Sequence, residues 1–418
     1  MLDLKWLREN PDAIREALKR RRVPFDLEPL LQIEKQHRAL LTRIEEQRHA
    51  LKKASEVFAR NKAKGEAPPK DLKKLSDDIA AHERSLKDLE GAIFRQVAVV
   101  PNIPHASVPD GDARANSIVR TQGDKPAFTF SPKTHLELGG SLGLLDFPRA
   151  AKVTGSNFPL YTGKGARLER MLLNWMLDVQ TKEHAYTEVS PPFLVNRASM
   201  FGTGQLPKFE EDMYRLKDDD LFLVPTAEVP LTNLHRDEVI EEDQLPLRYT
   251  AYTPCFRREA GAYGKETKGL IRVHQFDKVE LVKFVKPQTS YDELERLVCD
   301  AEAILKRLGL HYRVVCLAAG DLGFSAAKCY DLEAWAPGLN QYLEVSSCSN
   351  FEDFQARRAN IRYRQASTRK VAYAHTLNGS GLALARTLVC LLETYQLADG
   401  HIRIPEVLRP YLDGIDRF

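Results

Sequence analysis

The residues best suited to chemistry are charged side chains in two stretches, 255–259 and 269–280, which we predict to be the strands of a hairpin. Side chains alternate along a strand, so one face of this hairpin collects two guanidinium groups, one aromatic ring and two carboxylates. They are Arg257, Glu259, Arg272, Phe276 and Glu280. Unpaired charges are expensive inside a sheet core. Arg binds phosphate with a planar fork, Phe offers a stacking surface, and Glu accepts from ammonium, so the set predicts a nucleotide site beside an amine-bearing substrate.

These two stretches resemble motif 2 of the class II aminoacyl-tRNA synthetases, and within that class the seryl-tRNA synthetases. Four further segments are similar to other motifs of the same family and follow in the expected order. They are 187–194 (TEVSPPFL, motif 1, with Pro192 central), 225–228 (PTAE, serine binding), 344–350 (EVSSCSN, nucleotide and metal contacts) and 378–386 (NGSGLALAR, motif 3). Any one motif is weak evidence, but all of them in this order are specific. Ala385 and the loop 261–268 (GAYGKETK) differ from the family's usual motif sequences. Neither difference removes a charged site residue.

The resemblance implies a two-step reaction. Serine carboxylate attacks the α-phosphate of ATP to give seryl-adenylate and pyrophosphate, and the terminal ribose hydroxyl of tRNA(Ser) then attacks the adenylate carbonyl. Neither step needs a covalent protein nucleophile, because positioning and charge neutralisation are enough. We also expect tRNA(Sec) to be a substrate where that tRNA exists.

The resemblance assigns the site residues to groups. Serine binding is implied for Thr226, Ala227, Glu228, Arg257, Glu280, Asn378 and Ser380. ATP binding is implied for Arg257, Arg258, Glu259, Arg272, Val273, Phe276, Glu344, Val345, Ser346, Ser347 and Arg386. The catalytic residues among these are Arg257, Glu344 and Arg386. The two arginines are expected to clamp opposite ends of a bent triphosphate, with Glu259 on the adenine and Phe276 stacked on its ring.

A magnesium ion is expected to accompany ATP. Glu344 and Ser347 are the implied protein ligands, since Mg²⁺ prefers oxygen ligands and substrate phosphates. Strict alternation would pair Glu344 with Ser346 instead, so the strand should be bulged or bent there. No zinc is expected, because the six cysteines contain no C-x-x-C pair. The sequence does not decide whether Glu228 or Glu280 binds the serine ammonium and which one bonds the hydroxyl.

Length and composition set the broad class. A chain of 418 residues, 28% charged and 43% hydrophobic, has the composition of a globular protein of about two or three domains. The net charge is only +3, so any nucleic-acid site must be local. Charges occupy the N-terminal segment where an export signal would be apolar, and no apolar run reaches membrane-spanning length. We therefore expect a cytoplasmic protein with reduced thiols.

The N-terminal part is predicted to be helical, with one short amphipathic helix over the first 21 residues and a long hairpin arm at 27–97. The second half of the arm carries a heptad seam interrupted by one polar residue. The seam residues are Leu72, Leu75, Ile79, His82, Leu86, Leu89 and Ile93. The first half has a looser pattern that includes Leu41, with Glu34 and His37 among its interruptions. A turn at 65–69 (GEAPP) joins the halves, which predicts an antiparallel coiled coil.

The outer part of this arm is basic. Between Arg48 and Lys74 nine Lys or Arg residues stand against three acids. The basic residues are Arg48, Lys52, Lys53, Arg60, Lys62, Lys64, Lys70, Lys73 and Lys74. A run of charge is usually only a solvated face, but beside the synthetase motifs it favours a tRNA-binding arm. The resemblance implies that the arm reaches the long variable arm of tRNA bound across a homodimer, with Pro192 at the dimer interface.

We therefore predict an α+β protein with three parts: an N-terminal helical domain at 1–100, a proline-rich linker at 101–115 and a class II catalytic domain at 116–418. Strands are predicted at 221–224, 247–256, 270–285 and 342–346, and helices at 166–184, 290–308 and 382–397. They lack the regular alternation of a doubly wound sheet, which argues for an antiparallel sheet.

Some features have plainer explanations. Gly163-Lys164-Gly165 lacks the third glycine of a dinucleotide fingerprint and is predicted to be a helix N-terminal turn. His274 is predicted to satisfy a local hydrogen bond.

Two other functions fit part of the sequence. A synthetase paralogue that adenylates an amino acid for another acceptor would share the catalytic motifs, although such paralogues tend to lack the long arm. A non-catalytic coiled-coil interaction protein would be favoured by loss of Arg257, Glu280 or Arg386, and all three are present.

Overall fold

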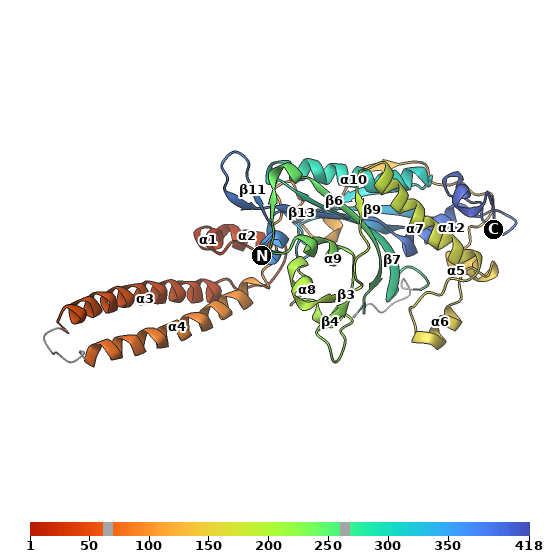
Figure 1. The fold of residues 1–418 in the computed structure, drawn as a ribbon. Coiled ribbons are helices and arrows are strands. Elements are labelled where there is room, and N and C mark those ends of the chain that lie inside the picture. Colours follow the sequence, from red (N-terminus) through yellow and green to blue (C-terminus); the bar gives the residue numbers. More distant parts are fainter. Residues whose placement is uncertain (62–69, 260–267) are drawn as a thin grey trace. The chain divides into compact units, whose positions relative to one another are not determined.

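The computed structural model describes residues 1–61, 70–259 and 268–418, and Figure 1 shows their fold. The described chain divides into two compact units. The first comprises Met1–Lys19 and Val23–Pro101, and the second comprises Arg20–Arg22 and Asn102–Phe418. Within the described residues no helix is long and apolar enough to cross a membrane.

The described residues of the first unit form four helices. They are α1 (Leu4–Glu9), α2 (Pro11–Arg20), α3 (Glu28–Asn61) and α4 (Lys70–Val97). The single helix predicted for the first 21 residues is wrong. Asn10 ends α1 and Pro11 begins α2, because proline has a preset helical φ and no N–H to bond and therefore suits the first turn of a helix.

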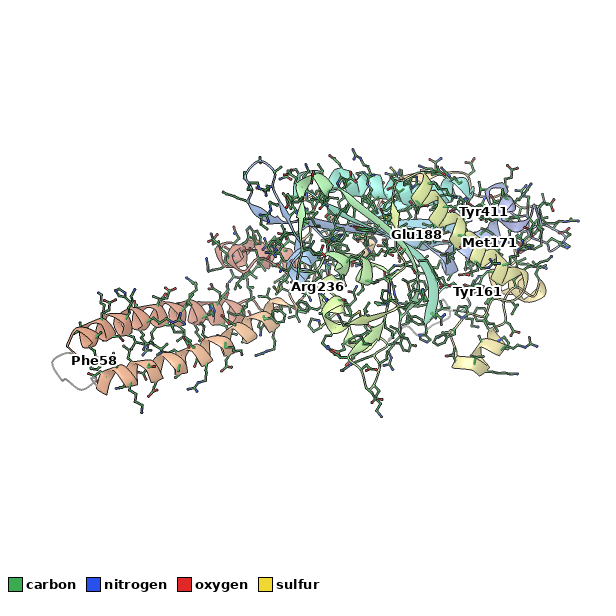
Figure 2. The ribbon with its side chains drawn as sticks, in the orientation of Figure 1. Phe58, Tyr161, Met171, Glu188, Arg236 and Tyr411 are labelled. Atoms are coloured by element: carbon green, nitrogen blue, oxygen red, sulfur yellow. The ribbon has the colours of Figure 1, made fainter. Side chains whose placement is uncertain are left out.

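Helices α3 and α4 lie side by side as an antiparallel pair (Figure 1). Ile44, Ile79 and Ile93 are buried between them, as the predicted seam requires, but Leu41 is 40% exposed. Phe58 lies near the turn end of α3 (Figure 2). The predicted turn at 65–69 falls outside the described residues.

Polar side chains that interrupt the apolar pattern of the hairpin have partners within the first unit. The buried carboxylate of Glu34 accepts from Arg8 at 2.9 Å and from Arg38 at 3.0 Å. Across the pair, His82 Nδ1 lies 2.8 Å from Gln47 Oε1. These contacts explain how polar groups are accommodated between the helices, because a buried charge is tolerated when it is paired.

The second unit is built on an eight-stranded sheet within the described residues, in the order β1-β8-β9-β10-β13-β7-β6-β2. In that order the strands are Ser117–Gln122, Tyr312–Cys316, Lys328–Ala336, Gln341–Asn350, His375–Ala383, Gln275–Val285, Leu247–Phe256 and Thr187–Glu188. All neighbouring strands are antiparallel except β2 and β6. The predicted antiparallel α+β fold is confirmed.

Smaller elements complete this unit. A three-stranded sheet contains β12 (Val371–Tyr373), β11 (Arg362–Arg364) and β5 (Val239–Glu241), and β3 (Leu194–Asn196) pairs with β4 (Leu221–Leu223). The helices are α5 His135–Ser141, α6 Phe147–Thr154, α7 Lys164–Lys182, α8 Arg197–Thr203, α9 Glu228–Thr232, α10 Ser290–Arg307, α11 Phe354–Ala359 and α12 Leu384–Thr394. The three predicted helices correspond to α7, α10 and α12. The last begins at Leu384 rather than 382, because β13 extends to Ala383.

Strand β7 shows how the large sheet separates its two faces. Val279 and Leu281 join the large core with residues of α7 and α10, whereas Val282 and Phe284 join a second core on the other face. Lys283 lies on the α10 face, where its ammonium pairs with Glu293 at 3.2 Å. Lys278 and Glu280 lie on the opposite face, as the period of two requires.

A close packing contact in this sheet yields a stability prediction. A Cβ at Gly379 would lie 2.3 Å from Leu297 Cδ2 of α10 and 2.9 Å from Cys348 Sγ. Gly379→Ala should therefore overpack the core and lower the free energy of unfolding by about 1–3 kcal/mol. Leu297→Ala should lower the free energy of unfolding by about 2–5 kcal/mol, because it leaves a cavity. Urea unfolding should show that the double variant loses less free energy of unfolding than the sum of the two single losses.

The matched control is Gly140→Ala, because nothing lies within 4 Å of the added methyl group and the site is exposed on α5. That change should be neutral or stabilise the protein by up to about 1 kcal/mol. Strict additivity of the Gly379 and Leu297 changes would contradict the packing argument.

Candidate functional site

A cavity of about 340 Å³ opens beside strands β6, β7, β10 and β13. Most of the residues predicted from the sequence to bind ligand line it. They are Thr226, Glu228, Arg257, Glu259, Arg272, Val273, Phe276, Glu344, Val345, Ser346, Ser347, Asn378, Ser380 and Arg386. Three predicted residues do not line it: Ala227 is buried in the second core, Arg258 is exposed, and Glu280 is fully buried. The structure thus brings together side chains from five separate segments of the chain.

The β6–β7 hairpin places the arginine and the aromatic ring. Cys255 of β6 pairs with Phe276 of β7, and Arg257 follows directly after the end of β6. Arg257 donates from its backbone to His274 O at 2.9 Å and from Nε to Pro225 O at 3.3 Å. Its guanidinium lies 5.2 Å from the ring centroid of Phe276. The predicted hydrogen bond of His274 is also found, from the ring to Arg257 O at 3.0 Å.

The extent of these strands was predicted wrongly at their loop ends. Strand β6 ends at Phe256 and β7 begins at Gln275, so Glu259 and Arg272 lie in irregular segments. Glu259 has a positive φ of 50°, which no strand residue adopts. The two side chains nevertheless meet, with Arg272 Nε 2.5 Å from Glu259 Oε2. The loop 261–267 lies outside the described residues.

Strand β10 is bulged where the sequence required it. Its pairing with β9 shifts register between Glu344 and Ser346, and an inserted residue reverses the alternation of side chains. The bulge brings both Glu344 and Ser347 to the cavity wall. The hydroxyl of Ser346 is buried and donates to Ser380 O at 2.6 Å. The predicted irregularity is therefore confirmed.

The oxygen atoms of Glu344 and Ser347 suit a magnesium ion. Mg²⁺ is bound through one or two protein oxygens together with substrate phosphates and water, rather than by a dedicated protein cage. Within the part of the chain that the structure describes, no cluster of three or more His, Cys, Asp or Glu residues could hold a metal ion. The donor set thus fits an ion that arrives with a phosphate-bearing ligand.

Arg386 connects three parts of the wall. Its Nε donates to Ile271 O at 3.0 Å and its Nη1 donates to Glu344 O at 3.0 Å. The same Nη1 lies 3.4 Å from the Glu344 carboxylate. Arg386 stands near the start of α12, directly after β13. Its guanidinium is therefore held in the cavity wall by backbone carbonyls, with its charge directed at the candidate metal ligand.

A buried charge cluster forms another part of the site. Lys278 Nζ donates to Thr226 Oγ1 at 2.8 Å and forms an ion pair with Glu280 Oε2 at 2.6 Å. Asn378 donates to Glu280 Oε1 at 2.9 Å. Burial raises the pKa of Glu280, and the Lys278 charge and the Asn378 amide oppose that rise. Sequence reasoning missed Lys278, although strand alternation between Phe276 and Glu280 marks it.

Glu228 is the second carboxylate of this cluster and faces the cavity. It accepts from Gln355 Nε2 at 2.6 Å. Burial and the neighbouring charge of Glu280 raise the pKa of Glu228 to about 7, while Gln355 and Lys278 oppose the rise. Gln355 was not predicted, because it comes from α11 and no local pattern marks it. The positive charges of Lys278 and Arg257 offset only part of the rise in the pKa of the two carboxyls.

The predicted interface residue Pro192 lies at the surface. Its segment follows β2, the edge strand that pairs with β6, and Pro192 itself is exposed. Phe193 and Leu194 are 40% and 41% exposed, and Glu188, the last residue of β2, is labelled in Figure 2. Exposed apolar side chains beside a sheet edge are typical of a surface that another chain covers.

The basic residues predicted on the arm are described in part. Lys52, Lys53, Lys73 and Lys74 are exposed, and Arg48 is exposed with an ion pair to Glu83 at 2.6 Å. The remaining predicted contacts fall on side chains outside the described residues. They are Arg60, Lys62, Lys64 and Lys70.

Comparisons with known proteins cover the whole chain. Residues 208–395 match the model of the class II tRNA synthetase core domain (G, H, P, S and T), and residues 1–104 match the seryl-tRNA synthetase N-terminal domain. The serine–tRNA ligase of Syntrophobacter fumaroxidans is 54% identical over 425 residues, which cover 100% of each chain.

Two solved structures are also similar. The seryl-tRNA synthetase from Pyrococcus horikoshii complexed with ATP has a TM-score of 0.93 at 37% identity, over 100% of this chain and 99% of that chain. The cytoplasmic serine–tRNA ligase from Naegleria fowleri in complex with AMP has a TM-score of 0.88 at 30% identity, over 100% and 98%.

The charge cluster predicts a pH-dependent stability. Lys278→Met removes the ammonium that lowers the pKa of both carboxyls, so the pKa of Glu228 should rise above about 7 and that of Glu280 should rise further. A carboxyl with a raised folded-state pKa loses its contribution to stability as pH rises through that pKa. The free energy of unfolding of the variant should therefore fall increasingly below that of the native chain between about pH 6 and pH 8.5, by roughly 1–3 kcal/mol.

Urea unfolding across that range measures the effect. Lys278→Arg is the matched control, because it keeps the positive charge and should run nearly parallel to the native chain. Parallel curves for Lys278→Met would show that the ammonium does not control the ionisation of the two carboxyls.

Proposed function

Because the chain belongs to the seryl-tRNA synthetase family of class II aminoacyl-tRNA synthetases, a family of ATP-dependent ligases, we propose that its cavity performs both steps of serine transfer. In the first, L-serine and ATP give seryl-adenylate and pyrophosphate. In the second, the seryl group passes to the 3′ end of tRNA(Ser). The observation that carries the proposal is the meeting of Arg257 and Arg386 with a buried carboxylate–ammonium cluster at one cavity.

The charge cluster supports serine as the substrate. The pKa values of Glu228 and Glu280 stay raised despite the charges of Lys278 and Arg257, so we expect the ammonium of a bound amino acid to add a favourable positive charge. This charge favours the ionised form of Glu228, whose pKa burial raises. The hydroxyl of serine then lies among polar groups that include Thr226, Asn378 and Ser380. An amino acid without that hydroxyl would leave some of them unpaired, so the site should reject it strongly.

The cavity also suits the nucleotide. Arg257 and Arg386 stand on different segments of the wall and neutralise charge on the phosphates, which brings the serine carboxylate within reach of the α-phosphate. Phe276 offers its ring to the adenine, and Glu259 accepts from the exocyclic amine. Glu344 and Ser347 are the proposed ligands of Mg²⁺, which supplies further neutralisation of the phosphates when bound. Each of these roles is proposed from position and chemistry.

The proposal includes the macromolecular partners. The exposed lysines of the arm suit the phosphates of tRNA(Ser), and tRNA(Sec) where it exists. A homodimer with Pro192 at its interface is supported by the exposed apolar residues beside β2. The proposal places the enzyme in the cytoplasm. A paralogue that serves another acceptor is disfavoured, because the chain matches the seryl N-terminal domain model over 1–104.

Amino-acid-dependent ATP–pyrophosphate exchange tests the first step. With Mg²⁺ and no tRNA, we expect exchange with serine alone among the twenty amino acids. Arg386→Gln should reduce it by about 100-fold or more, the scale for loss of one charge-stabilising group. Arg403→Gln, at an exposed site outside the cavity, should leave it unchanged. Exchange with another amino acid and not with serine would contradict the proposed substrate.

The arm proposal predicts a separate defect. Replacing Lys52, Lys53, Lys73 and Lys74 by Gln should raise KM for tRNA(Ser) and flatten the dependence of tRNA affinity on salt, because fewer counterions are released. Serine-dependent exchange should be unaffected. Aminoacylation assays at several salt concentrations measure both effects.

The matched control replaces an equal number of exposed cations on the same two helices, Lys35, Arg43, Arg84 and Lys87. If this control weakens tRNA binding equally, or if the first variant behaves like the native chain, the outer part of the arm is not the binding surface.

A further inference from the structure

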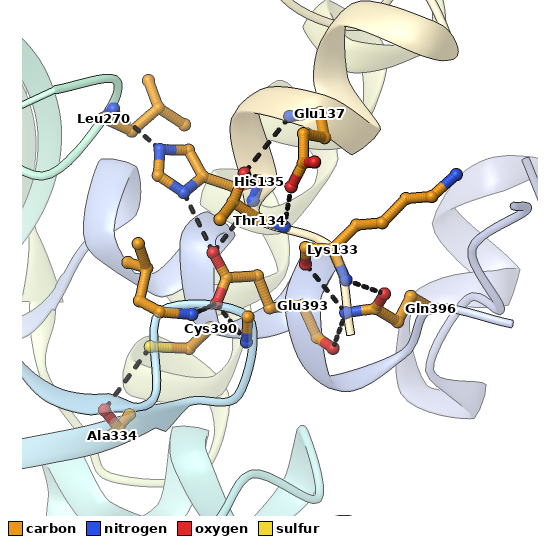
Figure 3. A network of polar contacts seen from close by, with 11 residues as sticks. Lys133, Thr134, His135, Glu137, Leu270, Ala334, Cys390, Glu393 and Gln396 are labelled. Atoms are coloured by element: carbon orange, nitrogen blue, oxygen red, sulfur yellow. Dashed lines mark hydrogen bonds and ion pairs between the residues drawn. The ribbon is translucent and has the colours of Figure 1, made fainter. Parts of the chain in front are cut away.

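A buried histidine–glutamate pair lies outside the residues assigned to substrates (Figure 3). His135, at the start of α5, and Glu393, near the end of α12, are both fully buried. His135 Nδ1 lies 3.0 Å from Glu393 Oε1, and its Nε2 lies 3.2 Å from the backbone nitrogen of Leu270. A backbone N–H can only donate, so Nε2 must be the acceptor. The proton of the neutral imidazole therefore sits on Nδ1 and is donated to Glu393.

Glu393 holds this imidazole in place. Its carboxylate also accepts from the backbone N–H of His135 at 2.9 Å, of Gly338 at 2.9 Å and of Leu339 at 3.1 Å. Gln396, just beyond the end of α12, bonds the backbone of Lys133 through both its oxygen and its nitrogen. The start of α5 is thus tied to α12 and to the turn between β9 and β10, which leaves His135 little freedom to rotate.

The contact with Leu270 matters because that residue begins one wall of the cavity. Residues 270–273 all line the cavity, and they precede β7, so no strand pairing holds their backbone. Leu270 donates its N–H to His135, and the next residue, Ile271, offers its carbonyl to Arg386 Nε at 3.0 Å. The start of this stretch is therefore held at Leu270 by His135 and at the next residue by the arginine proposed to bind phosphate.

The neighbouring glycine shows how closely the wall approaches the imidazole. Gly269 has a φ of +72°, and a Cβ there would lie 2.3 Å from His135 Nε2. Only glycine combines this backbone conformation with that approach. Glycine at position 269 therefore allows the backbone to pack directly against the imidazole of His135.

Helix α12 carries both anchors. Arg386 and Glu393 stand seven residues apart on it, about two helical turns, and so lie near the same face. Glu393 acts through His135 on the N–H of Leu270, and Arg386 acts directly on the carbonyl of Ile271. Any shift of the Leu270–Ile271 backbone would move the acceptor that orients the Arg386 guanidinium.

We propose that His135 is a positioning residue for ATP: its Nε2 fixes the N–H of Leu270 and thereby places the Ile271 carbonyl that orients Arg386. The inference rests on the proposed function, because it gives the cavity wall a role in nucleotide binding. It adds a residue that touches no substrate and acts through the wall.

Two isosteric changes separate this role from simple core packing. The amide of asparagine lies as many bonds from Cα as Nδ1 of histidine, so His135→Asn keeps a donor for Glu393 and loses the acceptor for Leu270. The amide of glutamine reaches the place of Nε2, so His135→Gln keeps an acceptor for Leu270 and loses the donor for Glu393. Each variant therefore preserves one of the two contacts.

Serine-dependent ATP–pyrophosphate exchange by the full-length chain is the test, with KM determined separately for ATP and for serine. His135→Asn should raise KM for ATP about three- to tenfold, the scale of one lost hydrogen bond, and leave KM for serine unchanged. His135→Gln should stay within about twofold of the native chain for both substrates. Exchange by the native chain establishes the proposed function independently, so failure of that function and failure of this inference are distinguishable.

Other outcomes would overturn the inference. A defective Gln variant beside a normal Asn variant would show that only the contact with Glu393 matters. Equal changes in both KM values together with a lowered melting temperature would show a purely structural role, and two normal variants would show none.

A double variant tests the route through Arg386. In the Arg386→Gln background, calorimetric titration should show that His135→Asn causes no further loss of ATP affinity, because its effect is already absent. If the losses of ATP affinity in the two single variants add up in the double variant, His135 does not act through Arg386.

Discussion

The antiparallel register of β6, β7 and β13 is the constraint on which the candidate site depends. In this register Cys255 pairs with Phe276, Ala251 pairs with Glu280, and Ser380 of β13 also pairs with Glu280. A slip of one residue would exchange the two faces of β7. It would turn Lys278 and Glu280 toward α10 and place Val279 and Leu281 in the cavity. Burial of the apolar face of β7 against α7 and α10 therefore fixes the register that places Lys278 and Glu280 on the opposite face.

The charges on that face are retained only because each has a partner. Lys278 neutralises part of the buried carboxylate charge, and Gln355 bonds Glu228. An isolated carboxylate in such a place would take up a proton. The raised pKa of Glu228 shows that compensation is incomplete without a ligand. The proposed function uses this imbalance, because the ammonium of a bound amino acid favours the ionised form of Glu228.

Local patterns in the sequence predicted a large part of this structure, and their failures have physical causes. Strands with clear alternation were placed well, and even the bulge in β10 followed from the need to present both Glu344 and Ser347. Lys278 could have been predicted, because it stands two residues from both Phe276 and Glu280. Gln355 could not, since its contact with Glu228 depends on how α11 packs across a long separation in sequence. The split of the first helix at Pro11 was a missed local signal.

The strands and the irregular segments of the cavity wall are fixed by different means. Residues on β7, β10 and β13 inherit their positions from ladders of backbone hydrogen bonds, so their side chains need little further support. Residues 270–273 precede β7 and belong to no strand ladder. There the structure supplies a side-chain acceptor, His135, for one backbone N–H and a side-chain donor, Arg386, for the next carbonyl. Both are anchored on or through α12, whose long apolar face is buried in the core. The irregular part of the wall is therefore held in place by His135 and Arg386, which connect it to a helix buried in the hydrophobic core.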